Sequence, residues 1–267
     1  MNGKIDVTYL YFDERTLGNN VYITPRDYEI AFKDLENRVF RYYGHEVAAF
    51  YDALDDYTIS GKRGLIFGLT GCNCEAIALW KGAAEVYVVD YNKPFCAHDA
   101  VHTVTHDELR NLPVQFDFAI SFSSFEHDGL GRYGDPIDPD GDLRAMKEAG
   151  TYLTDDGILF LGVPLGPDCL CWNAHRIYGP IRLPVLLRGW LPLDVYSIYP
   201  DVFGSALGEH RQPLLVLKKC DSRRQYNDQL AHLFKSNQAL MDIPKPYGTK
   251  DKKMLGQILE FLLSERV

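Results

Sequence analysis

Strand-like apolar runs alternate with helix-like segments between residues 64 and 163. Helices are expected at residues 73–81, with Asn73 as the cap and Gly82 as the stop, and from Pro139 to Leu153, with Asp138 as the cap. Strands are expected at residues 65–67, 85–90, 101–105, 116–123 and 158–163. This alternation predicts an α/β domain with a mostly parallel sheet and helices on both faces.

The segments on either side of this region differ from it in pattern. Residues 1–60 look mostly helical, because Thr24-Pro25 is a typical helix start and apolar residues follow at near-helical spacing. Residues 175–187 are also expected to be helical, whereas 193–199 and 214–218 are expected to be the last two strands.

An amphipathic stripe lies close to the C-terminus. It comprises Met254, Leu255, Ile258, Leu259 and Leu262. We expect it to pack on the domain or on a partner subunit rather than on a membrane. The chain therefore divides into a helical extension at 1–60, an α/β domain at 61–220 and a helical extension at 221–267.

Composition and charge narrow the function classes. Hydrophobic residues make up 46% of the 267 residues, which is enough for a full core. The net charge of −9 argues against nucleic acid as the main partner, because phosphate binding needs clustered Lys and Arg. No apolar run reaches about 18 residues, so we expect neither a membrane span nor a signal peptide, and a cytoplasmic location.

The six cysteines include two Cys-x-Cys pairs, Cys72/Cys74 and Cys169/Cys171. Zinc ligands are usually separated by two to four residues, so we expect buried thiols and assign no metal site. The acid-rich loop at 126–142 leaves open a divalent cation held by oxygen ligands.

Ligands of a parallel sheet bind at the carboxyl ends of its strands. A glycine turn follows the first strand, and Asp90 ends the second, 19 residues after Gly71. This spacing is typical of a nucleotide-binding βαβ unit and favours Asp90 as the acceptor of ribose hydroxyls. We expect the ligand to contact Gly68, Thr70, Gly71, Asp90, Tyr91, Asp107, Glu108 and Ser123.

Two polar loops follow the fourth and fifth strands and are expected to meet at one pocket. In the first, His127 is a candidate base that can equally be structural, and Asp135 can be the base or can orient His175. The second loop holds residues 173–178. We expect the substrate to contact Arg132, Tyr133, Arg176 and Tyr178, although both arginines can equally form structural ion pairs.

Several motifs occur in the order found in class I S-adenosylmethionine-dependent methyltransferases. They are an acid before Leu112-Pro113, an FD strand at Phe116-Asp117 that leads to Glu126-His127, and the turn at 153–158. The resemblance implies that Asp90 binds ribose and Asp107 faces the adenine amino group. Thr70 and Cys72 stand where this family usually has glycine, and Ile66 stands where it usually has an acid.

A more specific resemblance rests on the segments SFSSFEHDGLGRYGDPIDPDGDL (121–143) and NAHRIYG (173–179). They are similar to a methyltransferase-like family of unknown function that was first described from nematodes. The match runs from about Gly64 to Pro213.

These resemblances imply a Rossmann-like class I fold and an S-adenosylmethionine-dependent methyltransferase. The acid- and tyrosine-rich loop at 126–142 favours a small-molecule or glycan hydroxyl as acceptor, and the terminal helices make a homo-oligomer possible. The alternative is an inactive scaffold of the same fold, favoured by the incomplete glycine loop. A dinucleotide oxidoreductase ranks last, because the GxGxxG fingerprint is absent.

Overall fold

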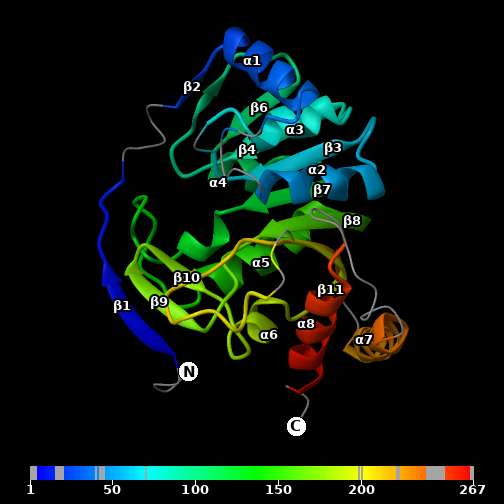
Figure 1. Ribbon diagram of the computed structural model, residues 1–267. Helices are drawn as coiled ribbons and strands as arrows, with labels where there is room; N and C mark the ends of the chain where they lie inside the picture. The colour runs from blue at the N-terminus through cyan, green and yellow to red at the C-terminus, as the bar shows by residue number, and fades with distance from the viewer. Residues whose placement is uncertain are drawn as a thin grey trace.

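A seven-stranded sheet forms the centre of the molecule, with a three-stranded sheet and a two-stranded ribbon beside it (Figure 1). The structure is a computed structural model that describes residues 5–15, 21–39, 41, 46–69, 71–197, 199, 201–220, 223–238 and 250–264. The central strands are β3 (Arg63–Phe67), β4 (Glu85–Val89), β6 (Val101–Val104), β7 (Phe116–Phe122), β8 (Leu153–Gly162), β11 (Trp190–Tyr196) and β12 (Leu214–Lys219).

The central strands run in the order β11-β12-β8-β7-β3-β4-β6. The five strands from β8 to β6 are parallel, whereas β12 is antiparallel to both β8 and β11. The predicted Rossmann-like sheet and its final pair of strands are therefore confirmed. The chain leaves β3 first toward β4 and later toward β7, so the switch in strand order lies at β3.

Helices cover both faces of the central sheet (Figure 1). Successive strand residues point to opposite faces, so Leu65 packs in one core and Ile66 in the other. The Ile66 side is covered by α1 (Pro25–Glu36), α2 (Glu46–Asp56) and α3 (Cys74–Trp80). The Leu65 side is covered by α4 (His106–Arg110), α5 (Gly141–Tyr152), α6 (Leu183–Leu186), α7 (Arg223–Gln238) and α8 (Lys252–Ser264).

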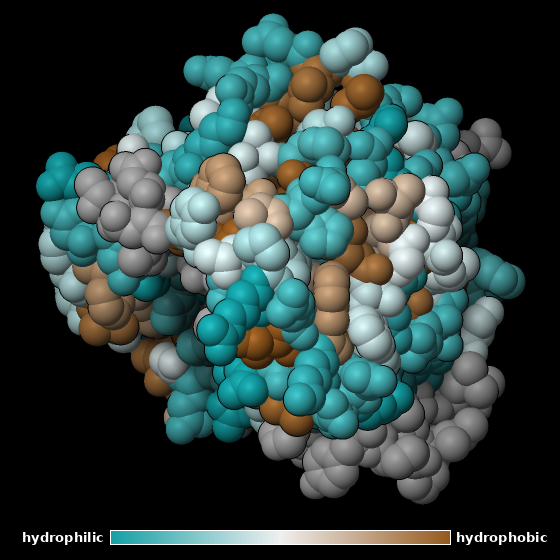
Figure 2. All heavy atoms as spheres, turned by 90° about the horizontal axis from the view of Figure 1, so that it is seen from above, coloured by the Kyte–Doolittle hydropathy of each residue, from teal (hydrophilic) through white to brown (hydrophobic). Residues whose placement is uncertain are grey.

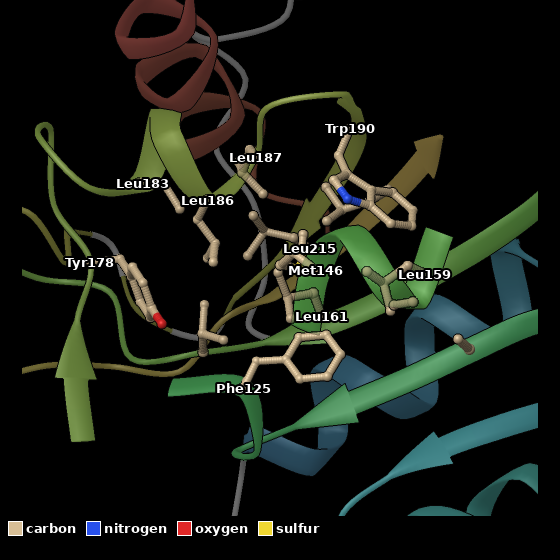
Figure 3. Packing of buried hydrophobic residues seen from close by; sticks show 14 of the residues in the cluster. Phe125, Met146, Leu159, Leu161, Tyr178, Leu183, Leu186, Leu187, Trp190 and Leu215 are labelled. Atoms are coloured by element: carbon tan, nitrogen blue, oxygen red, sulfur yellow. The ribbon is translucent and has the colours of Figure 1, made fainter. Parts of the chain in front are cut away.

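Side chains from loops also enter the core on the Leu65 side. Phe125 and Tyr178 point into the same cluster as Met146 of α5 and Leu161 of β8 (Figure 3). Seen from above in the orientation of Figure 1, the surface of the molecule is mostly polar with scattered apolar spots (Figure 2).

The helix starts show which caps the sequence predicted correctly. Thr24 makes the predicted cap, since its hydroxyl accepts from the Asp27 backbone N–H. Asn73 makes no side-chain cap bond. The cap predicted at Asp138 is wrong because α5 begins at Gly141, and the Asp138 carboxylate instead accepts from a backbone N–H of the preceding turn.

The helix predicted at 175–187 is wrong. Its first part is β10 (His175–Ile177), which pairs antiparallel with β9 (Cys169–Asn173), and only the short α6 follows. β9 also pairs in parallel with β1 (Asp6–Leu10), a strand that the sequence did not predict. The ribbon pairs β2 (Tyr22–Ile23) with β5 (Phe95–Cys96).

The C-terminal stripe packs within this chain. Met254, Ile258 and Leu262 are buried in the core on the Leu65 side, and α8 lies against α7 and β11. The stripe is therefore not a free surface for a partner subunit. Across the described ranges, the structure contains no helix with the length and apolar character needed to cross a membrane.

Candidate functional site

A cleft opens at the carboxyl ends of β3, β4 and β7. The sheet places it there because these strands are parallel and their following loops leave from one edge. Its walls come from the loops at 67–74, 89–92 and 122–128, together with His106 and Tyr133. This cleft is the candidate site.

The first wall is the turn after β3. Gly68 has a φ of +76°, and a Cβ there would lie 2.8 Å from the Ser124 hydroxyl, so this position requires glycine. Gly71 also lines the cleft, whereas Thr70 lies outside the described residues. Cys72 is absent from the cleft wall and packs in the core beneath α1, so its side chain does not narrow the site.

Asp90 lies at the end of β4 and lines the cleft. One carboxylate oxygen accepts from the Leu69 backbone N–H and the other from that of Asn92, each at 3.0 Å. Burial raises the pKa of Asp90 because the charged form loses water. Among the described residues, neither lysine nor arginine lines this cleft.

The adjoining part of the cleft is aromatic. The Tyr91 and His106 rings are 4.6 Å apart, and the Phe67 and Phe125 rings are 4.9 Å apart. Burial lowers the pKa of His106, so its ring is neutral at pH 7. A planar group bound here would have aromatic rings on its sides.

Neither Asp107 nor Glu108 lines this cleft. Asp107 lines the adjoining pocket, whose wall also includes Tyr91, His106 and Phe125. The Asp107 side chain is 90% exposed and pairs with Arg110, while Glu108 pairs with Lys93. Both acids stand in the first turn of α4, and neither lines the cleft. His106 was not among the residues expected at the site, yet it lines both the cleft and the adjoining pocket.

The end of β7 brings polar groups to the cleft floor. Ser123 has a φ of +55°, an uncommon conformation for a residue with a side chain. Its hydroxyl donates to Glu126 Oε1 at 2.8 Å. Glu126 is fully buried, and this burial raises the pKa of its carboxyl to about 7.

His127 lines the cleft beside these residues. Its Nδ1 lies 2.6 Å from the Ala174 carbonyl oxygen, so Nδ1 carries the proton and donates. Nε2 is therefore an acceptor, and it lies 3.6 Å from Glu126 Oε1. Burial lowers the pKa of His127 to about 3, so the imidazole is neutral at pH 7.

Asp135 has a local role instead of the expected catalytic one. Its two carboxylate oxygens accept from the Gly131 and Tyr133 backbone N–H groups, at 3.0 and 3.2 Å. These bonds fix the turn that brings Tyr133 to the cleft. Asp128 does line the cleft, and burial raises the pKa of its carboxyl.

Arg176 and Tyr178 brace the loop at 126–142 rather than facing the cleft. Arg176 is buried and donates to the backbone carbonyls of Glu126, Asp128, Asp138 and Pro139. Tyr178 is also buried and donates its hydroxyl to Asp142. Arg176 and Tyr178 therefore stabilise the loop and do not make the substrate contacts in the cleft that had been expected of them.

The two polar loops meet, as the sequence analysis expected. The His127 and His175 rings are 6.3 Å apart, and His175 lies 4.9 Å from the His210 ring. His175 does not line the cleft, however, and burial lowers its pKa to about 4. Of the three neighbouring histidines His127, His175 and His210, only His127 lines the cleft.

The N-terminal segment braces the other side of the cleft. Phe12 exchanges two hydrogen bonds with the Asn173 side chain, and Glu14 pairs with Arg132. Asn92 donates to the Arg15 carbonyl, which joins this segment to the β4 loop. Arg132 also lies 4.5 Å above the Phe12 ring, so it is a structural anchor and does not line the cleft.

The sequence of residues 61–203 matches the family described as Caenorhabditis protein of unknown function, DUF268. This match covers more than half of the chain. The chain belongs to the DUF268 family. Its matched region contains every residue named above on the cleft wall. No curated protein matches the DUF268 chain in sequence.

Solved structures similar to this DUF268 protein include three methyltransferases. The 1,6-didemethyltoxoflavin-N1-methyltransferase of Burkholderia thailandensis is 17% identical, with a TM-score of 0.47 over 74% of this chain and 91% of that one. N-methyltransferase NodS of Bradyrhizobium japonicum is 14% identical, with a TM-score of 0.43 over 66% and 96%. Mitomycin 7-O-methyltransferase MmcR is 12% identical, with a TM-score of 0.44 over 70% and 57%. These similarities concern the fold alone.

Proposed function

We propose that this DUF268 protein is an S-adenosylmethionine-dependent methyltransferase that acts on a hydroxyl of a small molecule. The observation that carries the proposal is Asp90, a carboxylate at the end of the second strand that lines the cleft beside a glycine turn. Its hydrogen-bond partners are two backbone N–H groups, so its remaining lone pairs can accept two adjacent ligand hydroxyls.

The chemistry of the wall fits this cofactor. Tyr91, His106 and Phe125 offer aromatic surfaces for a purine. Asp90 contributes a carboxylate to a wall whose described residues include neither lysine nor arginine, which favours a ligand that carries cationic groups.

S-adenosylmethionine supplies a methyl group on a positively charged sulfur, from which a nucleophile displaces it. The chain contributes binding and orientation: Asp90 holds the hydroxyl pair, and the aromatic side chains align the ring. His127, neutral at pH 7, presents Nε2 as a hydrogen-bond acceptor for a donor group of the substrate. These roles require Asp90, the aromatic side chains and His127 to face the same cleft, and all of them line it.

Calorimetric titration with S-adenosylmethionine and S-adenosylhomocysteine, with NAD as a control, tests the proposal. We expect both sulfur compounds to bind and Asp90→Asn to weaken them about 10- to 100-fold, as for a lost hydrogen-bond partner. Asp156→Asn is the matched control, since that exposed carboxylate lines neither the cleft nor the pocket beside it and should leave affinity unchanged. If neither compound binds, the proposal is wrong and the scaffold alternative stands.

A further inference from the structure

A hydroxyl acceptor must lose its proton when it is methylated, and the cleft floor contains two groups that can take it. His127 lines the cleft directly, whereas Glu126 lies behind the wall. Ser123 lines the cleft and donates its hydroxyl to Glu126 Oε1 at 2.8 Å. One hydrogen bond therefore links a hydroxyl on the cleft wall to a buried carboxylate, and a substrate hydroxyl that donates to Ser123 would complete a path for a proton.

We propose that Glu126 accepts, through the Ser123 hydroxyl, the proton that the substrate hydroxyl loses when it is methylated. This inference rests on the proposed methyltransferase function and adds a residue that the function itself does not identify. The acceptor proton moves to Ser123 Oγ as the serine proton moves to Glu126 Oε1. The electron pair of the broken O–H bond forms the oxygen–methyl bond, and the carbon–sulfur pair stays on sulfur, which becomes a neutral thioether.

The surroundings of Glu126 fit a group that changes its protonation state. The side chain is completely buried, and Oε2 has no hydrogen-bond partner within the part of the chain that the structure describes. Gln212 Nε2 approaches Oε1 at 3.5 Å and is a neutral donor. A buried carboxylate without a direct cationic partner holds a proton more readily than one in water.

The charged groups near Glu126 come from several elements. Arg176 donates to its backbone carbonyl rather than to its carboxylate, and the charge of Arg132 lowers its pKa only in part. The other neighbours are uncharged or acidic. The groups facing Glu126 are His127, Asp128, Arg132, Arg176, Tyr178 and Gln212.

The pKa values of Glu126 and His127 show which of the two is the better proton acceptor at neutral pH. Proton acceptors work best when their pKa lies near the working pH. Burial raises the pKa of Glu126 to about 7 but lowers that of His127 to about 3. Protonating His127 is therefore unfavourable at neutral pH. The hydroxyl that is methylated has a single proton, which it donates to Ser123, so His127 Nε2 accepts from another group of the substrate.

The first test needs no catalysis. The Glu126 carboxyl should titrate near pH 7 in carbon-13 NMR, with its signal identified by its loss in Glu126→Gln. Ser123→Ala should raise this midpoint, because the serine hydrogen bond favours the charged form. The neighbouring Ser124→Ala is the matched control. A midpoint near 4.5, or one unmoved by Ser123→Ala, overturns the proposal.

The second test measures methyl transfer from S-adenosylmethionine to a phenol, a catechol and a monosaccharide. Glu126→Gln and Ser123→Ala should each lower kcat about 100-fold or more with unchanged cofactor affinity. Glu126→Gln should also remove the rise of kcat with pH through 7. Glu75→Gln is the control, since Glu75 is equally buried, with a pKa also raised to about 7, and lies outside the path.

The outcomes separate the two proposals. Full activity of Glu126→Gln with an unchanged pH profile contradicts the role of Glu126 but leaves the methyltransferase function intact. Failure of the wild-type protein to bind S-adenosylmethionine contradicts the proposed function, and with it the proton transfer, even if Glu126 titrates near pH 7.

Discussion

Replacing Glu75 by glutamine should remove the loss of stability that Glu75 causes as the pH rises from 4.5 to about 7. Glu75 stands in the first turn of α3 and is fully buried. One carboxylate oxygen accepts from the Asn73 backbone N–H at 3.2 Å, and the other has no hydrogen-bond partner among the residues described. Burial raises the pKa of this carboxyl from the ordinary 4.5 to about 7.

The sign follows from proton linkage. The folded protein holds the Glu75 proton more tightly than the unfolded chain, so this contribution to stability is complete below pH 4.5. It is lost as the pH rises from 4.5 through about 7. At 1.36 kcal/mol per pH unit, the loss is about 3 kcal/mol in the free energy of unfolding.

Glutamine has nearly the same shape and stays neutral at every pH. Glu75→Gln should therefore gain about 3 kcal/mol relative to the wild type between pH 4.5 and pH 8. Urea unfolding of both proteins at several pH values measures this difference. In a chain of this size, the gain corresponds to about 5 °C in Tm.

Glu85→Gln provides a control of opposite sign. Its hydrogen bond with Arg63 lowers the pKa of Glu85, so the charged form stabilises the fold above the ordinary pKa. That variant should lose stability on going from pH 4 to pH 8 relative to the wild type. If the stability difference between Glu75→Gln and the wild type is the same at every pH, the Glu75 argument is refuted.

Two further predictions concern the braces around the cleft. Arg182→Met should lower the free energy of unfolding by about 3–5 kcal/mol, because Arg182 donates twice to the fully buried Asp142, and thermal denaturation of this variant checks it. A change below about 1 kcal/mol would contradict this account of the pair. His175→Ala should lower Tm while leaving S-adenosylmethionine affinity unchanged, since His175 packs between His127 and His210 outside the cleft. A large loss of affinity in calorimetry would instead place His175 in the site.

The strand and helix pattern of the central domain was predictable because it depends on local sequence. Buried parallel strands are short apolar runs, and the residues that follow them lie at one edge of the sheet. Gly68, Asp90 and Ser123 could therefore be assigned to the cleft edge from the positions of the strand ends alone, and all three line the cleft.

The elements beside the central sheet were not predictable in the same way. β1 pairs with β9 across more than 160 residues, and all of its side chains are exposed. Such a strand has no buried face, so no alternation of apolar and polar residues marks it. The segment that follows β9 was expected to be helical, yet its partner strand makes it β10.

The roles of the polar side chains were decided by tertiary structure. Arginine and aspartate look alike in a sequence whether they face a ligand or brace a loop. Arg176 meets the Asp128 carbonyl 48 positions away, and Tyr178 meets Asp142 36 positions away. A buried polar group must find partners, and which partners it finds depends on how distant segments pack.

The sequence by itself determined the sheet, its edge and the residues that could reach that edge, because these follow from periodicity and strand ends. Only the tertiary structure separated Asp90, which lines the cleft, from Asp107, which pairs with Arg110 in solvent. It also gave Glu126 its burial and its link to Ser123. The physical reason is that exposure and hydrogen bonding are properties of the packed chain, whereas periodicity belongs to each segment alone.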